Sequence, residues 1–185
     1  MKNSKLIFRY AKALYDISEE MDIVENVYQD ILYIQKLADD HRELRKALES
    51  PIIKQDKKLN IIREIFQKDI TETVYDFFML IIKKRREPDL LMICKQFIKI
   101  YYNNHHIKEA YITSAQPLSE KTSHYLKTYL EEDSLFTYIL HFSVNPKIIG
   151  GLIVQIDDYY FDASIQAKIN KLKAEFSQNN YASGF

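Results

Sequence analysis

Residues 71–86 read TETVYDFFMLIIKKRR, and this stretch decides the character of the first half of the chain. Its apolar residues occupy most of the circumference of a helix: Phe77, Phe78, Leu80, Ile81 and Ile82. A helix of this kind has to be enclosed by other helices. We therefore expect a central, deeply buried helix from about Thr71 to Arg86. The closing run KKRR fits a helix C-terminus, where cations complement exposed carbonyl groups, with nucleic-acid binding as the alternative.

Apolar residues at helical spacing predict further helices around this one. The first helix has a face that steps by three and four residues, through Leu6, Tyr10, Leu14, Ile17 and Met21. Two acidic residues, each followed three positions later by glutamate, have capping-box spacing and should begin the next two helices at Asp22 and Asp40. No glycine precedes residue 150. Residues 1–105 are therefore predicted to form a bundle of six helices joined by short connections.

The pattern changes after residue 105. Short segments rich in β-forming residues predict four strands, at 107–113, 138–144, 152–156 and 159–162. Asp157-Asp158 is expected to be the turn between the last two strands. Helical spacing returns at 119–130 and from Ile165 onward. Residues 106–185 are thus predicted to be a small α+β domain, and the chain as a whole is mainly α.

Composition excludes several classes of protein. The chain has 185 residues with 26 basic and 26 acidic groups, and this zero net charge disfavours a general nucleic-acid binder. Three glycines are too few for a Walker loop or a dinucleotide fingerprint, and one cysteine excludes an internal disulfide. The longest apolar stretches are far below the roughly 20 residues that span a bilayer. The N-terminus does not resemble a secretory signal, so we expect a cytoplasmic protein.

No residue pattern points to catalysis. The pair His105-His106 has no carboxylate or cysteine at metal-ligand spacing. Cys94 lies on an apolar helix face without an activating base. Asp162 and Ser164 are more simply interpreted as candidate caps for the last helix. We therefore expect no catalytic residue, no metal and no cofactor.

Three stretches resemble one protein family in matching order. Residues 9–15, RYAKALY, are similar to the opening helix of the delta subunit of F-type ATP synthase, whose mitochondrial relative is the oligomycin-sensitivity-conferring protein. Residues 76–81, DFFMLI, followed by Arg86, resemble the fifth helix of that family. Residues 145–154, NPKIIGGLIV, resemble its C-terminal signature. The resemblance covers essentially the whole chain.

The C-terminal signature places a double glycine before a strand and an Asp-x-Ser start before the last helix. Its structural residues here are Gly150, Gly151, Asp162 and Ser164. The chain departs from the family at three positions, which usually hold a basic residue, glycine and glycine: Gln155, Asp157 and Ala163. The substitution at Asp157 is expected to cost some stability in the turn between the last two strands.

The resemblance implies a non-catalytic stator subunit that links two neighbours. In this family the N-terminal domain binds N-terminal helices of the alpha subunits on the catalytic head, and the C-terminal domain holds the b subunits of the peripheral stalk. Rotation is thereby coupled to ATP synthesis. The chain would be a monomer within a hetero-oligomeric complex, held through its partners at the cytoplasmic face of a bacterial inner membrane, without membrane insertion and without nucleic acid.

The resemblance also directs attention to particular residues. The groove for an alpha helix is expected to be bordered by Tyr10, Ala13, Leu80 and Ile81, unless the last two belong purely to the core. The contact with the b subunits is expected on the stripe of the last helix together with nearby strand residues. This stripe consists of Ile165, Ile169, Leu172 and Phe176. The competing interpretations are a freestanding helical adaptor or weak RNA-binding module that uses residues 83–86, and a small hydrolase that uses His105 or Cys94.

Overall fold

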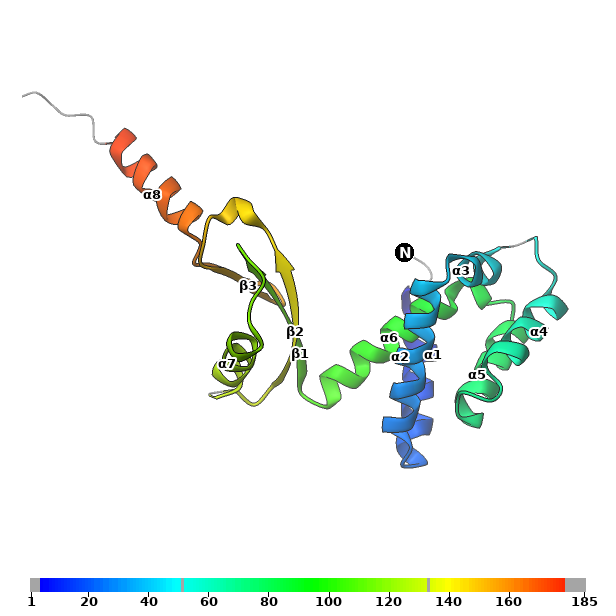
Figure 1. Ribbon diagram of the computed structural model, residues 1–185. Helices are drawn as coiled ribbons and strands as arrows, with labels where there is room; N and C mark the ends of the chain where they lie inside the picture. The colour runs from blue at the N-terminus through cyan, green and yellow to red at the C-terminus, as the bar shows by residue number, and fades with distance from the viewer. Residues whose placement is uncertain (1–3, 51, 133, 179–185) are drawn as a thin grey trace, which may run out of the picture. The chain divides into compact units, whose positions relative to one another are not determined.

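The computed structural model describes residues 4–50, 52–132 and 134–178. The chain divides into two compact units, Met1–Asn104 and His105–Phe185, which we call unit 1 and unit 2 (Figure 1). Each unit buries its own set of apolar side chains.

Unit 1 is a helical bundle, as the sequence predicts. Its described residues form six α-helices and one 3-10 helix: α1 (Ser4–Glu20), α2 (Val24–Asp40), α3 (Arg42–Glu49), α4 (Gln55–Phe66), α5 (Glu72–Lys83), η1 (Glu87–Asp89) and α6 (Leu90–Asn104). The predicted six-helix order is confirmed. The fifth helix ends earlier than expected, because Arg85 adopts a positive φ of 57° and turns the chain out of the helix.

The most extensive helix–helix contacts in unit 1 are made by α6, which packs against both α1 and α2. Helix α5 buries Val74, Phe78, Ile81 and Ile82 and packs mainly on α4, where the rings of Phe66 and Phe78 meet edge to face at 6.2 Å. Leu80 on α5 is 45 % exposed. The expectation that α5 is the central, most buried helix is therefore wrong, because α6 makes the most extensive contacts and one flank of α5 faces outward.

The two predicted capping boxes do not form. The residues that precede α2 and α3 make no side-chain capping hydrogen bond. Asp22 lies in the left-handed region with a φ of 55°, and Asp40 is still the last residue of α2. The carboxylate of Glu25 accepts a hydrogen bond from the Tyr101 hydroxyl on α6. Glu25 is therefore engaged in a tertiary contact with α6 and not in the capping box that the sequence predicts with Asp22.

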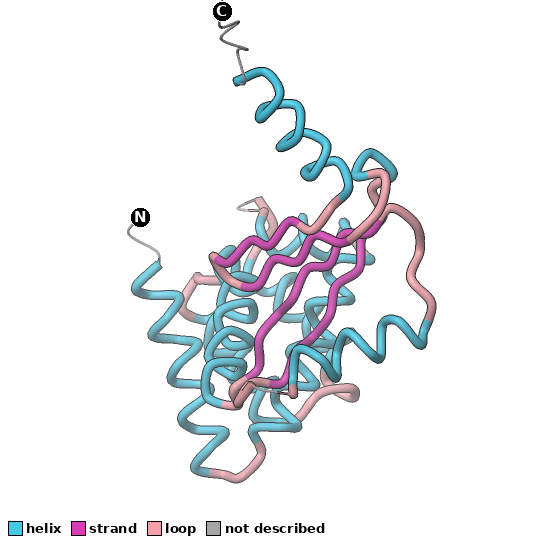
Figure 2. The backbone as a smooth tube through the Cα atoms, turned by 90° about the vertical axis from the view of Figure 1, so that its left-hand side faces the viewer, coloured by secondary structure: helices cyan, strands magenta, loops and turns pink. Residues whose placement is uncertain are grey.

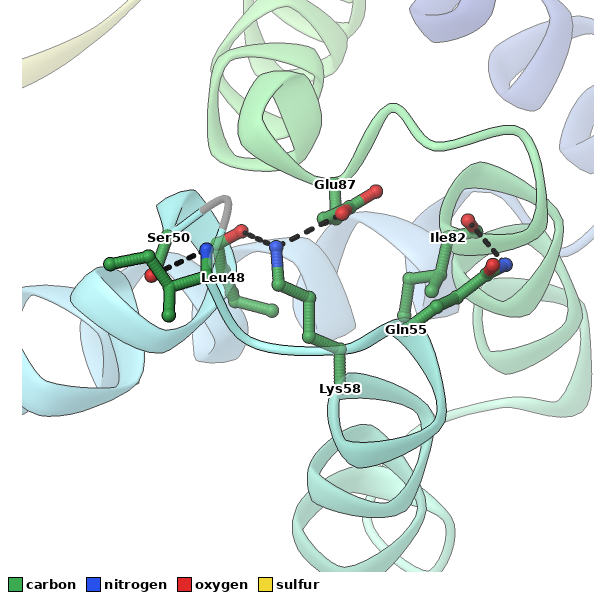
Figure 3. A network of polar contacts seen from close by, with 7 residues as sticks. Leu48, Ser50, Gln55, Lys58, Ile82 and Glu87 are labelled. Carbon is green, nitrogen blue, oxygen red and sulfur yellow. Dashed lines mark hydrogen bonds and ion pairs between the residues drawn. The ribbon is translucent and has the colours of Figure 1, made fainter.

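A buried lysine joins three segments of unit 1 (Figure 3). The side chain of Lys58 on α4 is 1 % exposed, and its Nζ donates to the Leu48 carbonyl at 2.8 Å and to Glu87 Oε1 at 3.0 Å. Beside it, Gln55 Nε2 donates to the Ile82 carbonyl at 2.9 Å. A charge taken out of water is tolerated when it is paired and hydrogen-bonded. The network therefore ties α3, α4 and η1 to one another, and α4 to the end of α5.

Unit 2 is built on a mixed sheet, whose described strands have the order β2-β1-β3-β4 (Figure 2). Its elements are β1 (Ile107–Ser114), α7 (Glu120–Glu131), β2 (Thr137–Val144), η2 (Pro146–Ile148), β3 (Leu152–Ile156), β4 (Tyr159–Asp162) and α8 (Ile165–Gln178). Strands β1 and β2 are parallel and are connected through α7, whereas β3 pairs antiparallel with β1 and with β4. The predicted strands, the turn at 157–158 and the last helix are confirmed.

One face of this sheet is apolar and only partly covered. Ala110 and Ile112 of β1 are buried, and the register places Ile112 beside Phe142 of β2 and Val154 of β3. Helix α7 packs on β2, yet Phe142 stays largely exposed. The core of unit 2 is therefore small compared with that of unit 1.

We expect the substitution Lys58→Met to lower the free energy of unfolding of the chain by about 3 kcal/mol, because it leaves the Glu87 carboxylate without its cation in a mostly buried site. The measurement is urea denaturation followed by circular dichroism. Lys57→Met, one residue away on the exposed side of α4, is the matched control and should change stability by less than about 0.5 kcal/mol. Equal losses in both variants would contradict a structural role for the buried pair.

Candidate partner-binding surfaces

Helices α1 and α5 share an exposed apolar flank. The buried side of α1 consists of Ala11, Leu14, Tyr15 and Ser18. Helical spacing gathers a second set of apolar residues beside it, which the core does not use. Tyr10 of this set packs edge to face on Phe77 of α5, with ring centroids 6.5 Å apart. We call this surface the α1/α5 face, formed by Leu6, Tyr10, Ala13, Ile17, Phe77 and Leu80.

The structure separates the four residues that the sequence predicts for the head contact. Tyr10 is half-buried, whereas Ala13 and Leu80 are exposed on the α1/α5 face. Ile81 is 0 % exposed and belongs to the core, which is the alternative that the sequence left open for it. The reason is geometric, because one residue turns a helix by about 100° and carries Ile81 from the exposed flank to the buried side.

The predicted stripe of α1 is real but lies mostly on the outside. Of its members, Leu14 is buried, whereas Ile17 and Met21 are exposed. The core instead uses Tyr15 and Ser18, whose hydroxyl donates to the Tyr15 carbonyl at 2.7 Å. The sequence therefore identifies an apolar stripe on α1 correctly, and the structure shows that part of this stripe belongs to the surface.

The basic run 83–86 stands at the C-terminal end of α5, as the capping interpretation predicts. The Arg85 and Arg86 amides donate to the carbonyls of Ile82 and Ile81, at 2.8 and 3.0 Å, and close the helix. Cations at this end complement the helix dipole. The run thus has a structural role that requires no nucleic acid.

The apolar stripe of α8 is exposed. Ile165, Leu172 and Phe176 are exposed and Ile169 is half-buried. In the described part of unit 2, the main contact of α8 is with η2, and Figures 1 and 2 show the helix extending past the sheet rather than lying across it. The predicted stripe is therefore present, and the core of unit 2 leaves it largely uncovered.

The double glycine lets the chain before β3 pack closely on the start of α8. Gly151 has a φ of 79°, and a Cβ there would lie 2.4 Å from the Ala163 carbonyl oxygen. The Gly150 carbonyl accepts a hydrogen bond from the Ile165 amide at 2.9 Å. Both the positive φ and the close approach of the backbone require glycine at position 151. The glycine pair thus sets where the stripe of α8 begins.

Asp162 and Ser164, the two candidate caps, act together at the start of α8. The Ser164 hydroxyl accepts a hydrogen bond from the Ala167 amide at 3.1 Å, which is an N-cap. Asp162 Oδ1 accepts from the Ser164 amide at 2.8 Å, and these hydrogen bonds with Ser164 lower the pKa of the Asp162 carboxyl. The signature residues therefore hold α8 at its first turn.

Cys94 and His106, which the sequence raises as candidates for catalysis or metal binding, are each engaged in contacts within the protein. Burial raises the pKa of the Cys94 thiol to about 12, so the thiol stays protonated at neutral pH and is a poor nucleophile. The ring of His106 meets Phe136 edge to face at 5.8 Å. Among the described residues, no group of three or more potential ligands is placed to hold a metal ion. None of the described helices is long and apolar enough to span a membrane.

The sequence of the chain matches one known protein family. The family model for the ATP synthase delta (OSCP) subunit matches residues 7–176. The chain belongs to this family. The ATP synthase delta subunit of Amoebophilus asiaticus is 34% identical over 182 residues, covering 97% of this chain and 98% of the relative. That of Salinibacter ruber is 34% identical over 164 residues, covering 89% and 86%.

A solved structure has the same fold. The cryo-EM structure of the Toxoplasma gondii mitochondrial ATP synthase hexamer contains a chain that is similar with a TM-score of 0.70. The match covers 93% of this chain and 97% of the other, at 18% identity, and so concerns the fold. Membership in the delta (OSCP) family places the chain in the stator of an F-type ATP synthase, within a hetero-oligomer. It decides against a freestanding adaptor or RNA-binding module.

The sequence did not single out the edge strand β4 as a surface. Its aromatic residues Tyr159, Tyr160 and Phe161 are all strongly exposed. A short run of aromatics is typical of a strand that packs on a core, so its composition gave no signal of exposure. The strand order indicates this exposure instead, because β4 is an outer strand of the described sheet.

We expect Gly151→Ala to destabilise unit 2 far more than Gly150→Ala. The first substitution meets the Ala163 carbonyl at 2.4 Å and a φ of 79°, whereas the second meets the end of the Ile165 side chain at 2.8 Å, which can rotate away. Thermal unfolding of both variants measures the difference. We expect a loss of at least about 2 kcal/mol for Gly151→Ala and about 1 kcal/mol or less for Gly150→Ala. The reverse order would contradict the role given to Gly151.

Proposed function

We propose that the chain is a non-catalytic clamp in the stator, with the alpha subunits of the catalytic head bound to unit 1 and the b subunits of the peripheral stalk bound to unit 2. The observation that carries the proposal is that each unit has an uncovered apolar surface on its helices, the α1/α5 face on unit 1 and the stripe of α8 on unit 2. A protein that resists torque has to hold a partner at each end. The alpha and b subunits are the two partners that the resemblance to the delta subunit implies.

The α1/α5 face suits an amphipathic helix from an alpha subunit. Ala13 is small and exposed, so it lets a partner backbone approach, while Tyr10 and Leu80 supply apolar area. Apolar side chains of a docked helix recur at three and four residues and need such a paired border. Ile81 supports this surface only from beneath, as part of the core.

The stripe of α8 suits a helix from the stalk. It presents four apolar residues along one side: Ile165, Ile169, Leu172 and Phe176. Full burial of such a side chain stabilises a complex by roughly 1.5–3 kcal/mol, so a partner that covers the stripe gains several kcal/mol before the cost of association. The cap and the glycine pair hold the first turn of α8 in place for this contact.

The clamp has no catalytic residue of its own in this proposal. The protonated, buried Cys94 and the structural surroundings of His106 support that interpretation. We place the chain at the cytoplasmic face of a bacterial inner membrane, where it is held by its partner subunits. Family membership supports this location, because the delta subunit works as part of the ATP synthase complex.

We expect Leu80→Asp to weaken binding of a peptide that carries the N-terminal residues of the alpha subunit by at least about tenfold, because a charge on the α1/α5 face has to be desolvated on binding. Isothermal titration calorimetry on the full chain measures the affinity. Met92→Asp is the control, since Met92 is 54% exposed on α6 of the same unit and lies outside the α1/α5 face. Equal affinities of the two variants would reject this placement of the head contact.

We expect Leu172→Asp to release the b subunits while binding of the alpha peptide stays unchanged, since the two surfaces belong to separate units. Co-purification of b subunits with the tagged chain from membrane extracts reads out the first effect. Tyr125→Asp on α7 is the control, because Tyr125 is as exposed but lies off the stripe. Retention of b subunits by Leu172→Asp would place the stalk contact elsewhere.

A further inference from the structure

A strained turn lies between η2 and β3, in the segment that packs against the start of α8. Ile149 has φ 69° and ψ −43°, and the Gly150 amide donates to the Ile148 carbonyl at 2.8 Å, which makes a γ-turn centred on Ile149. This turn is rare and strained, and a β-branched side chain makes the positive φ worse. Strain of this kind persists where the surrounding structure enforces it, and it concentrates at functional positions.

The two neighbouring isoleucines of this turn, Ile148 and Ile149, differ in how far they are buried. Ile148 is 5% exposed and anchors the turn in the core of unit 2, whereas Ile149 is 56% exposed. The next residue, Gly150, lies against the Ile165 side chain and accepts a hydrogen bond from the Ile165 amide. Ile149 is therefore the chain neighbour of the residue that contacts Ile165, the first residue of the α8 stripe, and its exposed side chain is available to a partner there.

The charges of α8 indicate what kind of helix this surface accepts. With about 100° of rotation per residue, Lys168 and Lys173 lie about 70° to either side of the centre of the stripe. Both are exposed, and so is Glu175, which lies about 90° from the centre on the Lys168 side. Lys171 lies about 130° from the centre, on the back of the helix. The stripe thus has a cationic border on both sides, offset by one carboxylate.

We infer that the stalk-binding surface of unit 2 runs from the α8 stripe onto Ile149 and accepts an amphipathic helix whose apolar stripe is bordered by acidic side chains. This inference rests on the proposed function, which supplies the b subunits as the partner. Ile149 is an apolar anchor at one end of the surface. Lys168 and Lys173 favour a partner with acidic side chains at the border of its stripe. Opposite charges at the rim of an interface raise the rate of association, and like charges lower it.

The apolar anchor is tested with Ile149→Gly. Glycine adopts a positive φ without strain, so the melting temperature of the chain should change by less than about 4 °C, while the affinity for the soluble part of the b subunits falls by at least about tenfold. Leu135→Gly, which removes another exposed apolar side chain of unit 2, should leave the affinity unchanged within about twofold. An unchanged affinity in Ile149→Gly would remove Ile149 from the binding surface.

The charged border is tested on the same full-length chain with Lys173→Glu and Lys171→Glu, which change the charge of α8 equally. Binding of the b subunits by biolayer interferometry at about 50 mM NaCl should weaken about threefold to tenfold in Lys173→Glu and less than twofold in Lys171→Glu. The difference should shrink at about 500 mM NaCl. Equal effects of both variants would overturn the acidic border of the partner. If the unmodified chain failed to bind the b subunits, the proposed function itself would fall, and this inference with it.

Discussion

The apolar stripe of α8 sets the constraint on which the account of this chain depends. A small sheet with one covering helix leaves few places to bury it, and the main contact of α8 within its described unit is with the short η2. Each half-exposed Leu, Ile or Phe leaves roughly 1 kcal/mol of burial free energy unused. A helix in this position is therefore incomplete until a partner covers it. The glycine pair, the Ser164 cap and the γ-turn all serve to hold that helix where a partner can reach it.

Unit 1 meets a related requirement in another way. It has a full core around α6 and a buried Lys58–Glu87 pair that ties its segments together, so it is stable enough to leave one flank of α1 and α5 uncovered. Both helices carry more apolar residues than the bundle needs. The excess is used on the surface, where Tyr10 and Phe77 already pack against each other. A rigid bundle with an apolar flank is a suitable support for a helix that carries load.

Much of this arrangement follows from the sequence, and the failures have identifiable causes. Periodicity predicts the helices and strands because each needs a regular apolar face. It does not say which of two adjacent apolar faces on α1 is buried, nor whether Ile81 belongs to the groove or to the core, because both depend on how the helices pack. Capping-box spacing at Asp22 was overridden by the contact of Glu25 with Tyr101, which joins residues far apart in the chain. The buried Lys58 and the strained Ile149 depend on tertiary structure alone and leave no mark in local patterns.

The central claim is that the unbroken chain transmits force between the head and the stalk. The direct test is to insert a protease recognition sequence between Asn104 and His105, where the two units meet in sequence, and to cleave it in membranes that hold the assembled ATP synthase. ATP-driven proton pumping and ATP hydrolysis are then measured together. We predict that cleavage abolishes pumping while hydrolysis continues, because the head is no longer held against the rotor. Pumping that survives complete cleavage would show that the chain does not carry the load.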